Sequence, residues 1–282
     1  MPEIETQVRQ ACVADAPRML RLLDQAVRQY VSFGKEDLRY LLAKDRVWLA
    51  DTADTLWGFL CVTRRSSRVA DLRGLALANG WRVDSGVQAL LRPAIAELQH
   101  QQSGDLVCLG AAAWTVPPLQ RVGFALVDRI VYFERRVASA LTSGCSEVAV
   151  RPIRGDDLST LLSLDSCAFE PLWRFDQGHF MELLVTSGHS TIAERSRKAV
   201  GYAITDVVGD TGFVVRVAVH PDAQGQGIGG VLLADALDHC RASGASTVRL
   251  NTQESNTASH RLYQRFGFRR TGRSVPVLVK RL

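Results

Sequence analysis

The sequence predicts an α/β (α+β) protein made of two tandem domains, each with a mixed sheet flanked by helices. The chain has 282 residues, and a domain typically has about 100–200 residues. A pattern of residues recurs at an offset of about 142 positions, which indicates a duplication. Within each copy, segments with strand spacing are interleaved with segments with helical spacing, as in an α/β or α+β domain.

The composition is that of a globular protein. Hydrophobic residues make up 46% of the chain and charged residues 22%, which excludes collagen-like, low-complexity and mostly disordered chains. No apolar run approaches the roughly 18–20 residues of a membrane helix, and residues 1–5 lack the basic and apolar regions of a signal peptide. We therefore expect a soluble, cytoplasmic protein with no membrane partner.

Charge and metal-binding residue types exclude further classes. The 34 basic and 29 acidic residues are evenly spread, so we expect no nucleic-acid partner. The six cysteines form no Cys-x-x-Cys pair, which argues against a zinc ribbon and a disulfide framework, and we expect them to be buried. The six histidines show no ligand spacing, so we predict no metal site.

The duplication is visible at five separated places. The matching segments lie 142 to 144 positions apart and are Val8-Arg9 with Val150-Arg151, Leu49–Asp51 with Ile192–Glu194, Trp57–Phe59 with Val200–Tyr202, Leu75–Leu77 with Val217–Val219, and Gly123-Phe124 with Gly267-Phe268. A run of small and polar residues between Ala138 and Glu147 marks the boundary. The predicted domains are residues 1–140 and 145–282.

The order of elements can be followed along the second copy. An acidic turn at 155–157 precedes helical spacing, and Asp176 is the predicted N-cap of a second helix. The remaining predicted elements are a strand over Glu147–Pro152, extended segments at Ser190–Arg195, Val200–Val208 and Gly212–His220, a helix from Ile228 to the glycine at 244, a strand at Val248–Leu250, and a helix that starts at Asn256.

The most informative stretch runs from a Val-Ala-Val strand at 217–219 through a glycine loop into a helix. Four glycines among the six residues 225–230 let the backbone turn tightly and approach a ligand. Free N–H groups and the positive end of the helix dipole form an anion site suited to a pyrophosphate. Neither a P-loop nor a Rossmann fingerprint fits the spacing, and a glycine turn without a ligand is the alternative.

A second motif lies about thirty residues downstream, with Asn256, Leu262-Tyr263 and Gly267-Phe268. Together with Gln224-x-x-Gly227-x-Gly229, this motif resembles the GCN5-related N-acetyltransferase (GNAT) family. The resemblance covers roughly residues 213–270. It implies a mixed, mostly antiparallel sheet splayed between its fourth and fifth strands, with acetyl-CoA as donor and a primary amine as acceptor.

The resemblance also assigns roles to residues. In this family the donor's pyrophosphate lies on the glycine loop, and its pantetheine arm pairs with the edge of strand four. The backbone N–H of Val219 would stabilise the oxyanion, Asn256 would hydrogen-bond the pantetheine, and Tyr263 would protonate the departing thiolate; an ordinary core tyrosine is the alternative. Donor binding is thus assigned to Val217, Ala218, Val219, Gln224, Gly225, Gln226, Gly227, Ile228, Gly229, Gly230 and Asn256.

The general base and the acceptor stay open. In the branch of the family that acetylates ribosomal-protein N-termini, the strand before the Asn commonly reads Leu-Glu-Val-Arg, whereas here residues 250–253 read Leu-Asn-Thr-Gln. Glu254, acting through water, and His220 are the candidate bases, and each has a surface or structural role as the alternative. The acceptor is either an amine-bearing small molecule or a protein N-terminus, and the oligomeric state is not predicted.

The first copy lacks the parts of the donor site. At the repeat offset, residues 82–87 replace the glycine loop and keep one glycine, out of register. Leu119 stands in place of Tyr263, and Pro117-Pro118 is expected to interrupt its helix. We expect a degenerate first copy that does not bind donor, joined to an acetyl-CoA-dependent N-acetyltransferase; a non-catalytic acyl-CoA-binding sensor is the alternative.

Overall fold

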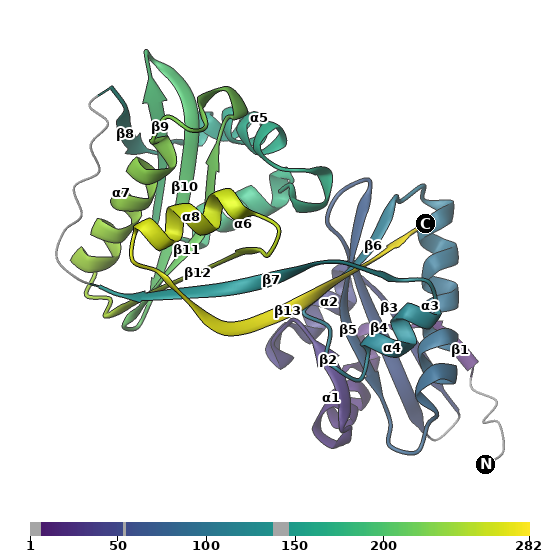
Figure 1. Ribbon diagram of the computed structural model, residues 1–282. Helices are drawn as coiled ribbons and strands as arrows, with labels where there is room; N and C mark the ends of the chain where they lie inside the picture. The colour runs from purple at the N-terminus through teal and green to yellow at the C-terminus, as the bar shows by residue number, and fades with distance from the viewer. Residues whose placement is uncertain (1–6, 53–54, 138–146) are drawn as a thin grey trace. The chain divides into compact units, whose positions relative to one another are not determined.

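A computed structural model describes residues 7–52, 55–137 and 147–282 and divides them into two compact units. Unit 1 contains the chain up to Asp128 together with Val275–Leu282, and unit 2 contains Arg129–Ser274. Each unit is a mixed α/β structure with a mostly antiparallel sheet flanked by helices (Figure 1). The predicted boundary at residues 138–147 falls almost entirely on 138–146, outside the described residues.

The sheet of unit 1 has the strand order β1-β3-β4-β5-β6-β13. All of these pairs are antiparallel except β5 with β6, and an additional strand, β2, pairs with β5. The elements that this unit takes from the first repeat are β1 (Gln7–Gln10), η1 (Val13–Asp15), α1 (Ala16–Gln25), β2 (Arg28–Val31), η2 (Lys35–Asp37), α2 (Leu38–Lys44), β3 (Arg46–Asp51), β4 (Leu56–Arg64), β5 (Val69–Leu77), α3 (Val83–His100), β6 (Asp105–Leu109) and α4 (Val116–Arg121).

Unit 2 repeats this plan with the order β7-β12-β11-β10-β9-β8, and here β11 with β12 is the parallel pair. The remaining elements, of which β7 and β13 are each divided between the two units, are β7 (Ala125–Arg136), β8 (Ala149–Pro152), η3 (Gly155–Asp157), α5 (Leu158–Ala168), η4 (Pro171–Trp173), α6 (Gln177–Thr186), β9 (His189–Arg195), β10 (Lys198–Val208), β11 (Thr211–Val219), η5 (Pro221–Ala223), α7 (Ile228–Ala242), β12 (Thr247–Gln253), α8 (Thr257–Arg265) and β13 (Arg269–Arg281). The predicted elements of the second copy are therefore all present, including the Asp176 cap, whose carboxylate accepts from the N–H of His179 at 2.9 Å.

The last strand of each repeat completes the sheet of the other unit. Strand β7 leaves the first repeat and pairs with β12 in unit 2 from Ile130 to Arg136. Strand β13 ends the second repeat and pairs with β6 in unit 1 from Val277 to Arg281. Each repeat is a continuous segment of chain, but unit 1 is not, because it takes its last strand from the end of the second repeat. A single boundary in the sequence therefore separates the repeats and does not separate the compact units.

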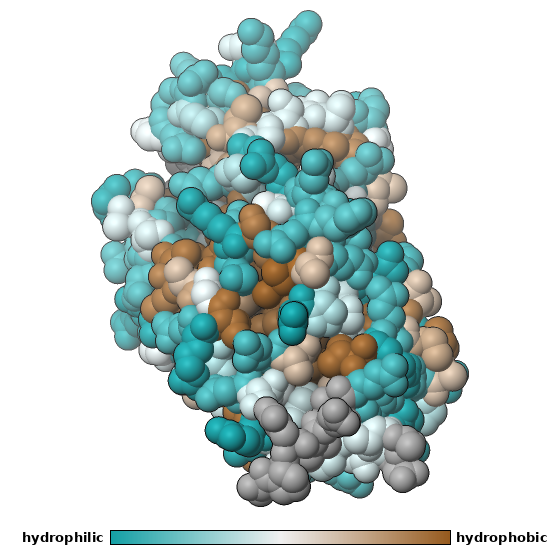
Figure 2. Space-filling view, turned by 90° about the vertical axis from the view of Figure 1, so that its right-hand side faces the viewer, coloured by the Kyte–Doolittle hydropathy of each residue, from teal (hydrophilic) through white to brown (hydrophobic). Residues whose placement is uncertain are grey.

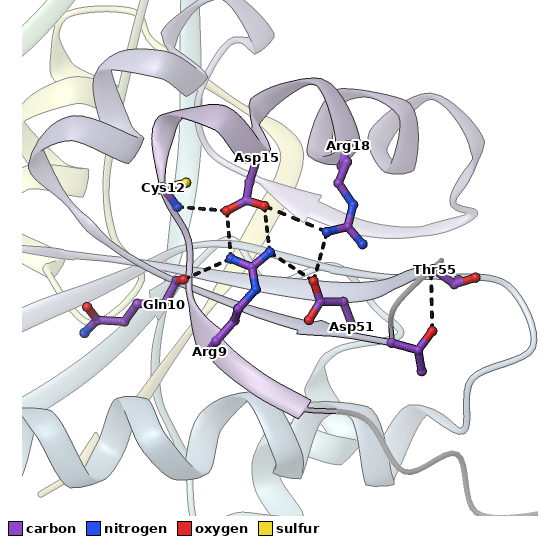
Figure 3. A network of polar contacts seen from close by, with 8 residues as sticks. Arg9, Gln10, Cys12, Asp15, Arg18, Asp51 and Thr55 are labelled. Carbon is purple, nitrogen blue, oxygen red and sulfur yellow. Dashed lines mark hydrogen bonds and ion pairs between the residues drawn. The ribbon is translucent and has the colours of Figure 1, made fainter.

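An arginine-centred ion network occurs at the same place in both units. In unit 1, Arg9 on β1 donates to Asp15 at 2.7 and 2.9 Å and to Asp51 at 3.0 Å, and Arg18 also donates to Asp51 (Figure 3). In unit 2 the counterparts Arg151, Asp157 and Glu194 repeat these ion pairs with distances of 2.7 to 2.8 Å. The network joins the first strand of each repeat to the start of its first helix and to the strand beside it in the sheet, which is β3 in unit 1 and β9 in unit 2.

Two expectations need correction. Cys61, Cys108 and Cys240 are buried as predicted, but Cys12 and Cys167 are exposed, because they lie at the ends of elements rather than on core faces; Cys145 lies outside the described residues. The prolines of α4 do not interrupt it. They occupy its first turn, where a missing N–H costs no intrahelical hydrogen bond.

The apolar residues lie mainly between the helices and the sheet faces. Alternation along β10 places Tyr202 and Ile204 against α5 and α6, and Ala203 against the α7 side. On the face seen in Figure 2, hydrophobic residues lie in groups among hydrophilic ones. Among the residues that the structure describes, none of the helices combines the length and the apolar composition of a membrane span.

Candidate active site

The site is built where β11 and β12 separate. These parallel strands pair only through Thr211–Phe213 and Thr247–Arg249, and no further pair between them is formed in the described part of the chain. A register shift against β10 follows, since Ile204 pairs with Arg216 but Thr205 pairs with Val214. This β-bulge at Val215 bends and re-aims the strand beyond it. The splay predicted between the fourth and fifth strands is confirmed.

Beyond the bulge, one edge of β11 is open. The N–H of His220 donates to Val200 O on β10 at 2.8 Å, and successive residues of a strand direct their backbone groups to opposite neighbours. The N–H groups of Val217 and Val219 therefore point away from β10, toward the splay. An open edge of this kind pairs readily with an extended ligand.

The glycine loop turns from β11 into α7 beside this edge. Gly225 and Gly227 have φ angles of +76° and +84°, and a Cβ at either position would meet nothing within 4 Å. These residues thus need the left-handed conformation and leave open space above the backbone. Gly227 is the N-cap of α7, a helix of 15 residues, whose first N–H groups have no intrahelical acceptor and favour an anion.

Helix α8 closes the other side of the site. Asn256 is its N-cap, and its Oδ1 accepts from the N–H of Ser259 at 3.1 Å. Tyr263 is 7% exposed and packs edge-on against Phe133 of β7, with ring centroids 5.8 Å apart. Burial raises the pKa of the Tyr263 phenol, and a hydrogen bond with Ser259 acts in the opposite direction. The phenol is therefore protonated at neutral pH and is able to donate a proton.

These elements line a cavity of about 590 Å³. All the residues predicted for the site line this cavity except Gln226. The Nε2 atom of Gln226 instead donates to Asp222 O at 3.0 Å. Gln226 thus points away from the cavity. The residues that sequence reasoning did not assign to the lining are Ala168, Phe169, Ala223, Ala258, Ser259, Arg261, Leu262 and Arg265.

Two of these residues carry a spacing signal in the sequence. Arg261 and Arg265 lie four residues apart on α8, so helical periodicity places them on one face of the helix, and both line the cavity. Tyr263 lies two residues from each of them, on another face, so spacing alone does not bring the arginines to the site. Phe169 follows α5 and comes next to β11 only in the fold. The two guanidinium groups give the cavity a positive lining, which suits phosphate groups.

Neither candidate base lies on the cavity. Glu254 is ion-paired with Arg270 at 2.6 Å, and the Nδ1 atom of His220 accepts from the N–H of Asp222 at 3.3 Å. Both side chains are absent from the lining residues. The described residues also contain no group of three or more side chains able to hold a metal ion.

Comparison with known proteins agrees with this geometry. Residues 157–268 match the model of the acetyltransferase (GNAT) family. The chain carries a GNAT domain. The matched range begins at the acidic turn before α5 and ends after α8, so it contains the whole cavity of unit 2.

Two relatives are similar to this GNAT domain. The ribosomal protein bS18-alanine N-acetyltransferase of Escherichia coli is 39% identical over 71 residues, which is 25% of this chain and 48% of that protein. The mycothiol acetyltransferase of Saccharopolyspora erythraea is 38% identical over 97 residues, which is 34% of this chain and 29% of that protein. The chain therefore matches half or less of the length of these two relatives.

Two solved structures extend the likeness beyond the GNAT domain. A GCN5-related N-acetyltransferase from Sphaerobacter thermophilus has a TM-score of 0.68 at 16% identity and covers 100% of this chain and 97% of its own. A tandem GNAT protein from the clavulanic acid biosynthesis pathway also has a TM-score of 0.68, at 13% identity, with 98% of both chains covered. The tandem GNAT fold thus spans both repeats.

Proposed function

We propose that the protein is an N-acetyltransferase that moves an acetyl group from acetyl-CoA to a primary amine by direct attack in a ternary complex. One observation carries the proposal: the open edge of β11, the glycine loop and the phenol of Tyr263 face a single cavity. An extended thiol ester with a pyrophosphate needs these three features in this order. Acetyl transfer itself is supported at the level of the family.

The residues present fit this donor substrate. The pyrophosphate would lie on the N–H groups at the start of α7, above Gly225 and Gly227, where the surface is free of Cβ atoms. The pantetheine arm would pair with the edge at Val217–Val219 as an added strand. Arg261 and Arg265 supply positive charge at the same cavity. Asn256 would contribute its amide Nδ2, since its Oδ1 is already used by the helix cap.

The reaction needs no covalent enzyme intermediate. The neutral amine nitrogen forms a bond to the thioester carbonyl carbon, and the N–H of Val219 stabilises the oxyanion of the tetrahedral adduct. The carbon–sulfur bond then breaks, and the phenol of Tyr263 donates its proton to the thiolate. The proton on the amine nitrogen of the adduct leaves to water, and the Tyr263 phenolate regains a proton from solvent, so the enzyme returns to its starting state. Neither Glu254 nor His220 lines the cavity, so neither is given a direct contact with the amine. Binding both substrates together supplies much of the rate enhancement.

The acceptor is proposed by class. The names of the two similar proteins give the alanine of a ribosomal protein and mycothiol as their acetylation targets. A protein N-terminus and a small amine are therefore both compatible with domains of this kind. Arg261 and Arg265 are assigned to the phosphates of the donor, so their charge does not select among these acceptors. The acceptor that we expect carries a primary amine, either at a protein N-terminus or on a small molecule.

The first repeat is proposed not to bind donor, because its own chain fills the corresponding places. Strand β2 pairs with Gly74–Leu77 of β5, the counterpart of the open edge of β11. Helix α3 begins at Val83, so the counterpart of the glycine loop is a helical turn. Leu119, in place of Tyr263, is fully buried. We retain 1–140 and 145–282 as the repeats, with their last strands exchanged.

Two measurements on the full chain test the function. Calorimetric titration with acetyl-CoA is expected to give one site per chain, and a stoichiometry of two would contradict the assignment of the first repeat. Release of free thiol is then followed with a peptide that begins with alanine, the thiol-free aminosugar glucosamine, and spermidine as acceptors. Donor binding without thiol release for any primary amine would favour an acyl-CoA sensor over an enzyme.

A further inference from the structure

A charged cluster is buried on the α5 side of the sheet in unit 2. Asp165 of α5 is 0% exposed. Its Oδ1 atom accepts from the hydroxyl of Tyr202 on β10 at 2.5 Å and from Arg216 on β11, at 2.5 Å from Nη2 and 3.0 Å from Nε. Arg216 directly precedes the open edge of β11, so the cluster lies at the base of the donor site.

The cluster holds residues 169–175, which we call the α5–α6 segment. Arg216 Nη2 donates to Trp173 O at 2.8 Å, and the N–H of Phe175 donates to Asp165 Oδ2 at 2.8 Å. The guanidinium carbon lies 3.6 Å from the ring centroid of Phe169 and 3.8 Å from that of Phe175, close enough for cation–π attraction. Phe169 itself lines the cavity. The start of the segment is thus fixed beside the donor site.

Unit 1 has apolar residues where unit 2 has this cluster. At the repeat offset, the counterparts of Asp165, Tyr202 and Arg216 are Leu23, Phe59 and Gly74. Leu23 and Phe59 belong to one buried core cluster, and Phe33 packs against it. A Cβ at Gly74 would lie 2.8 Å from the Phe33 ring, so an arginine has no room there. The fold is therefore formed without the charged cluster.

The chain after the first helix also differs between the units. In unit 1 the counterpart of the α5–α6 segment contains β2, whose residues 28–31 pair with Gly74–Leu77 of β5. In unit 2 the same stretch forms the short helix η4, and the counterpart edge of β11 is open. In unit 1, which lacks the charged cluster, the chain after the first helix pairs with β5 and fills the gap beside it. In unit 2, which has the cluster, the α5–α6 segment stays outside the gap between β11 and β12.

We propose that the Asp165–Tyr202–Arg216 cluster positions the α5–α6 segment away from the open edge of β11. The groove along this edge, which we call the donor groove, then stays accessible to acetyl-CoA. An open edge attracts any nearby peptide that can pair with it. A segment that enters the groove competes with the donor, and the apparent affinity falls by the fraction of time for which the groove is filled. This proposal rests on the proposed function for its binding test.

The decisive variant gives unit 2 the residues of unit 1. In Asp165→Leu/Tyr202→Phe/Arg216→Gly the whole cluster is replaced, so no buried charge is left without a partner. Arg216→Lys is the milder second variant, because an ammonium group cannot reproduce the planar donation and ring stacking of the guanidinium. The matched control is Arg151→Met, which breaks the ion network of β8 in the same unit and touches neither the cavity nor the α5–α6 segment.

The readouts are the Kd for acetyl-CoA and the hydrogen exchange of backbone amides at 169–175, both on the full chain. The triple variant is expected to bind acetyl-CoA about 10-fold more weakly and to exchange faster at Phe175, whose N–H loses its acceptor. Arg216→Lys should change both in the same direction, and Arg151→Met should change neither.

Unchanged Kd and unchanged exchange in a folded triple variant would overturn the proposal. If that variant does not fold, Arg216→Lys decides by the same two readouts. A wild-type chain that fails to bind acetyl-CoA would refute the proposed function instead, and the exchange at 169–175 would still test whether the cluster positions the segment.

Discussion

The buried phenol of Tyr263 is the single group whose removal tests the chemical step. Tyr263→Phe keeps the ring contacts with Phe133 and Phe268, so the helix should pack as before. Turnover is expected to fall about 10²-fold, the low end for general acid catalysis, because a thiolate leaves with little help. Single-turnover rates and the donor Kd measure this, with Tyr132→Phe on β7 as a matched control. Unchanged turnover would return Tyr263 to the role of a core residue.

Gly227 offers a second test at the residue scale. A side chain at its φ of +84° is strained, and it would also cover the backbone N–H groups at the start of α7. Gly227→Val is expected to weaken acetyl-CoA binding at least about 100-fold, the loss of two charge-assisted contacts. Gly244→Val is the control, because Gly244 has a φ of +82° just beyond the other end of the same helix. Equal losses in both variants would show a folding defect alone.

At the scale of elements, the ion network of Arg151 joins β8, the start of α5 and β9. The Arg151 guanidinium lowers the pKa of Asp157 from 3.8 to about 2. A carboxyl whose pKa is lowered on folding stabilises the protein above its unfolded pKa and loses that contribution as the pH falls toward the folded value. The stabilisation is thus present at pH 5 and above and declines between about pH 4 and pH 2.

Asp157→Asn should remove this pH-dependent contribution. Because the pair is partly exposed, we expect a loss of about 1–2 kcal/mol at pH 7. The difference between wild type and variant should shrink as the pH falls from 5 to 2. Urea unfolding at several pH values measures it. A difference that stays constant with pH would mean that the carboxylate charge contributes nothing.

At the scale of the whole molecule, the exchanged strands decide how the protein can be divided. Strand β7 supplies Val131 and Phe133 to the core of unit 2, where they are 0% and 1% exposed. A fragment of residues 145–282 lacks both side chains, and losing a buried Phe alone costs about 3–5 kcal/mol. We therefore expect fragment 145–282 to be insoluble or much less stable than fragment 129–282, which retains the paired part of β7.

Denaturant unfolding of the two fragments tests this difference, with acetyl-CoA affinity as the check on the site. The value of kcat/KM for the acceptor, compared with that of the full chain, then tests whether the first repeat takes part in acceptor use. A fragment 145–282 that is as stable as 129–282 would show that β13 can replace β7 beside β12.

Local sequence signals predict much of the donor site in this protein. The glycines at 225 and 227, the Asn256 cap and the helical spacing around Tyr263 each specify a conformation within a few residues, and all of them occur as predicted. The 142-residue repeat also identified the duplicated fold, because the same core positions are filled in both copies. Eleven of the twelve predicted site residues line one cavity; Gln226 does not, and its side chain donates to Asp222 O instead.

The tertiary structure decided what depends on competition between distant partners. Strands β7 and β13 occupy equivalent places at the ends of their repeats, so their position along the chain does not state which sheet each joins. The burial of Asp165 with Arg216, and the choice of the following segment between strand β2 in one unit and helix η4 in the other, depend on residues about 50 positions apart along the chain. The sequence by itself determined the helices, the strands and the glycine loop. The packing of residues far apart along the chain determined that the groove beside β5 is filled by β2 and that the groove beside β11 is open.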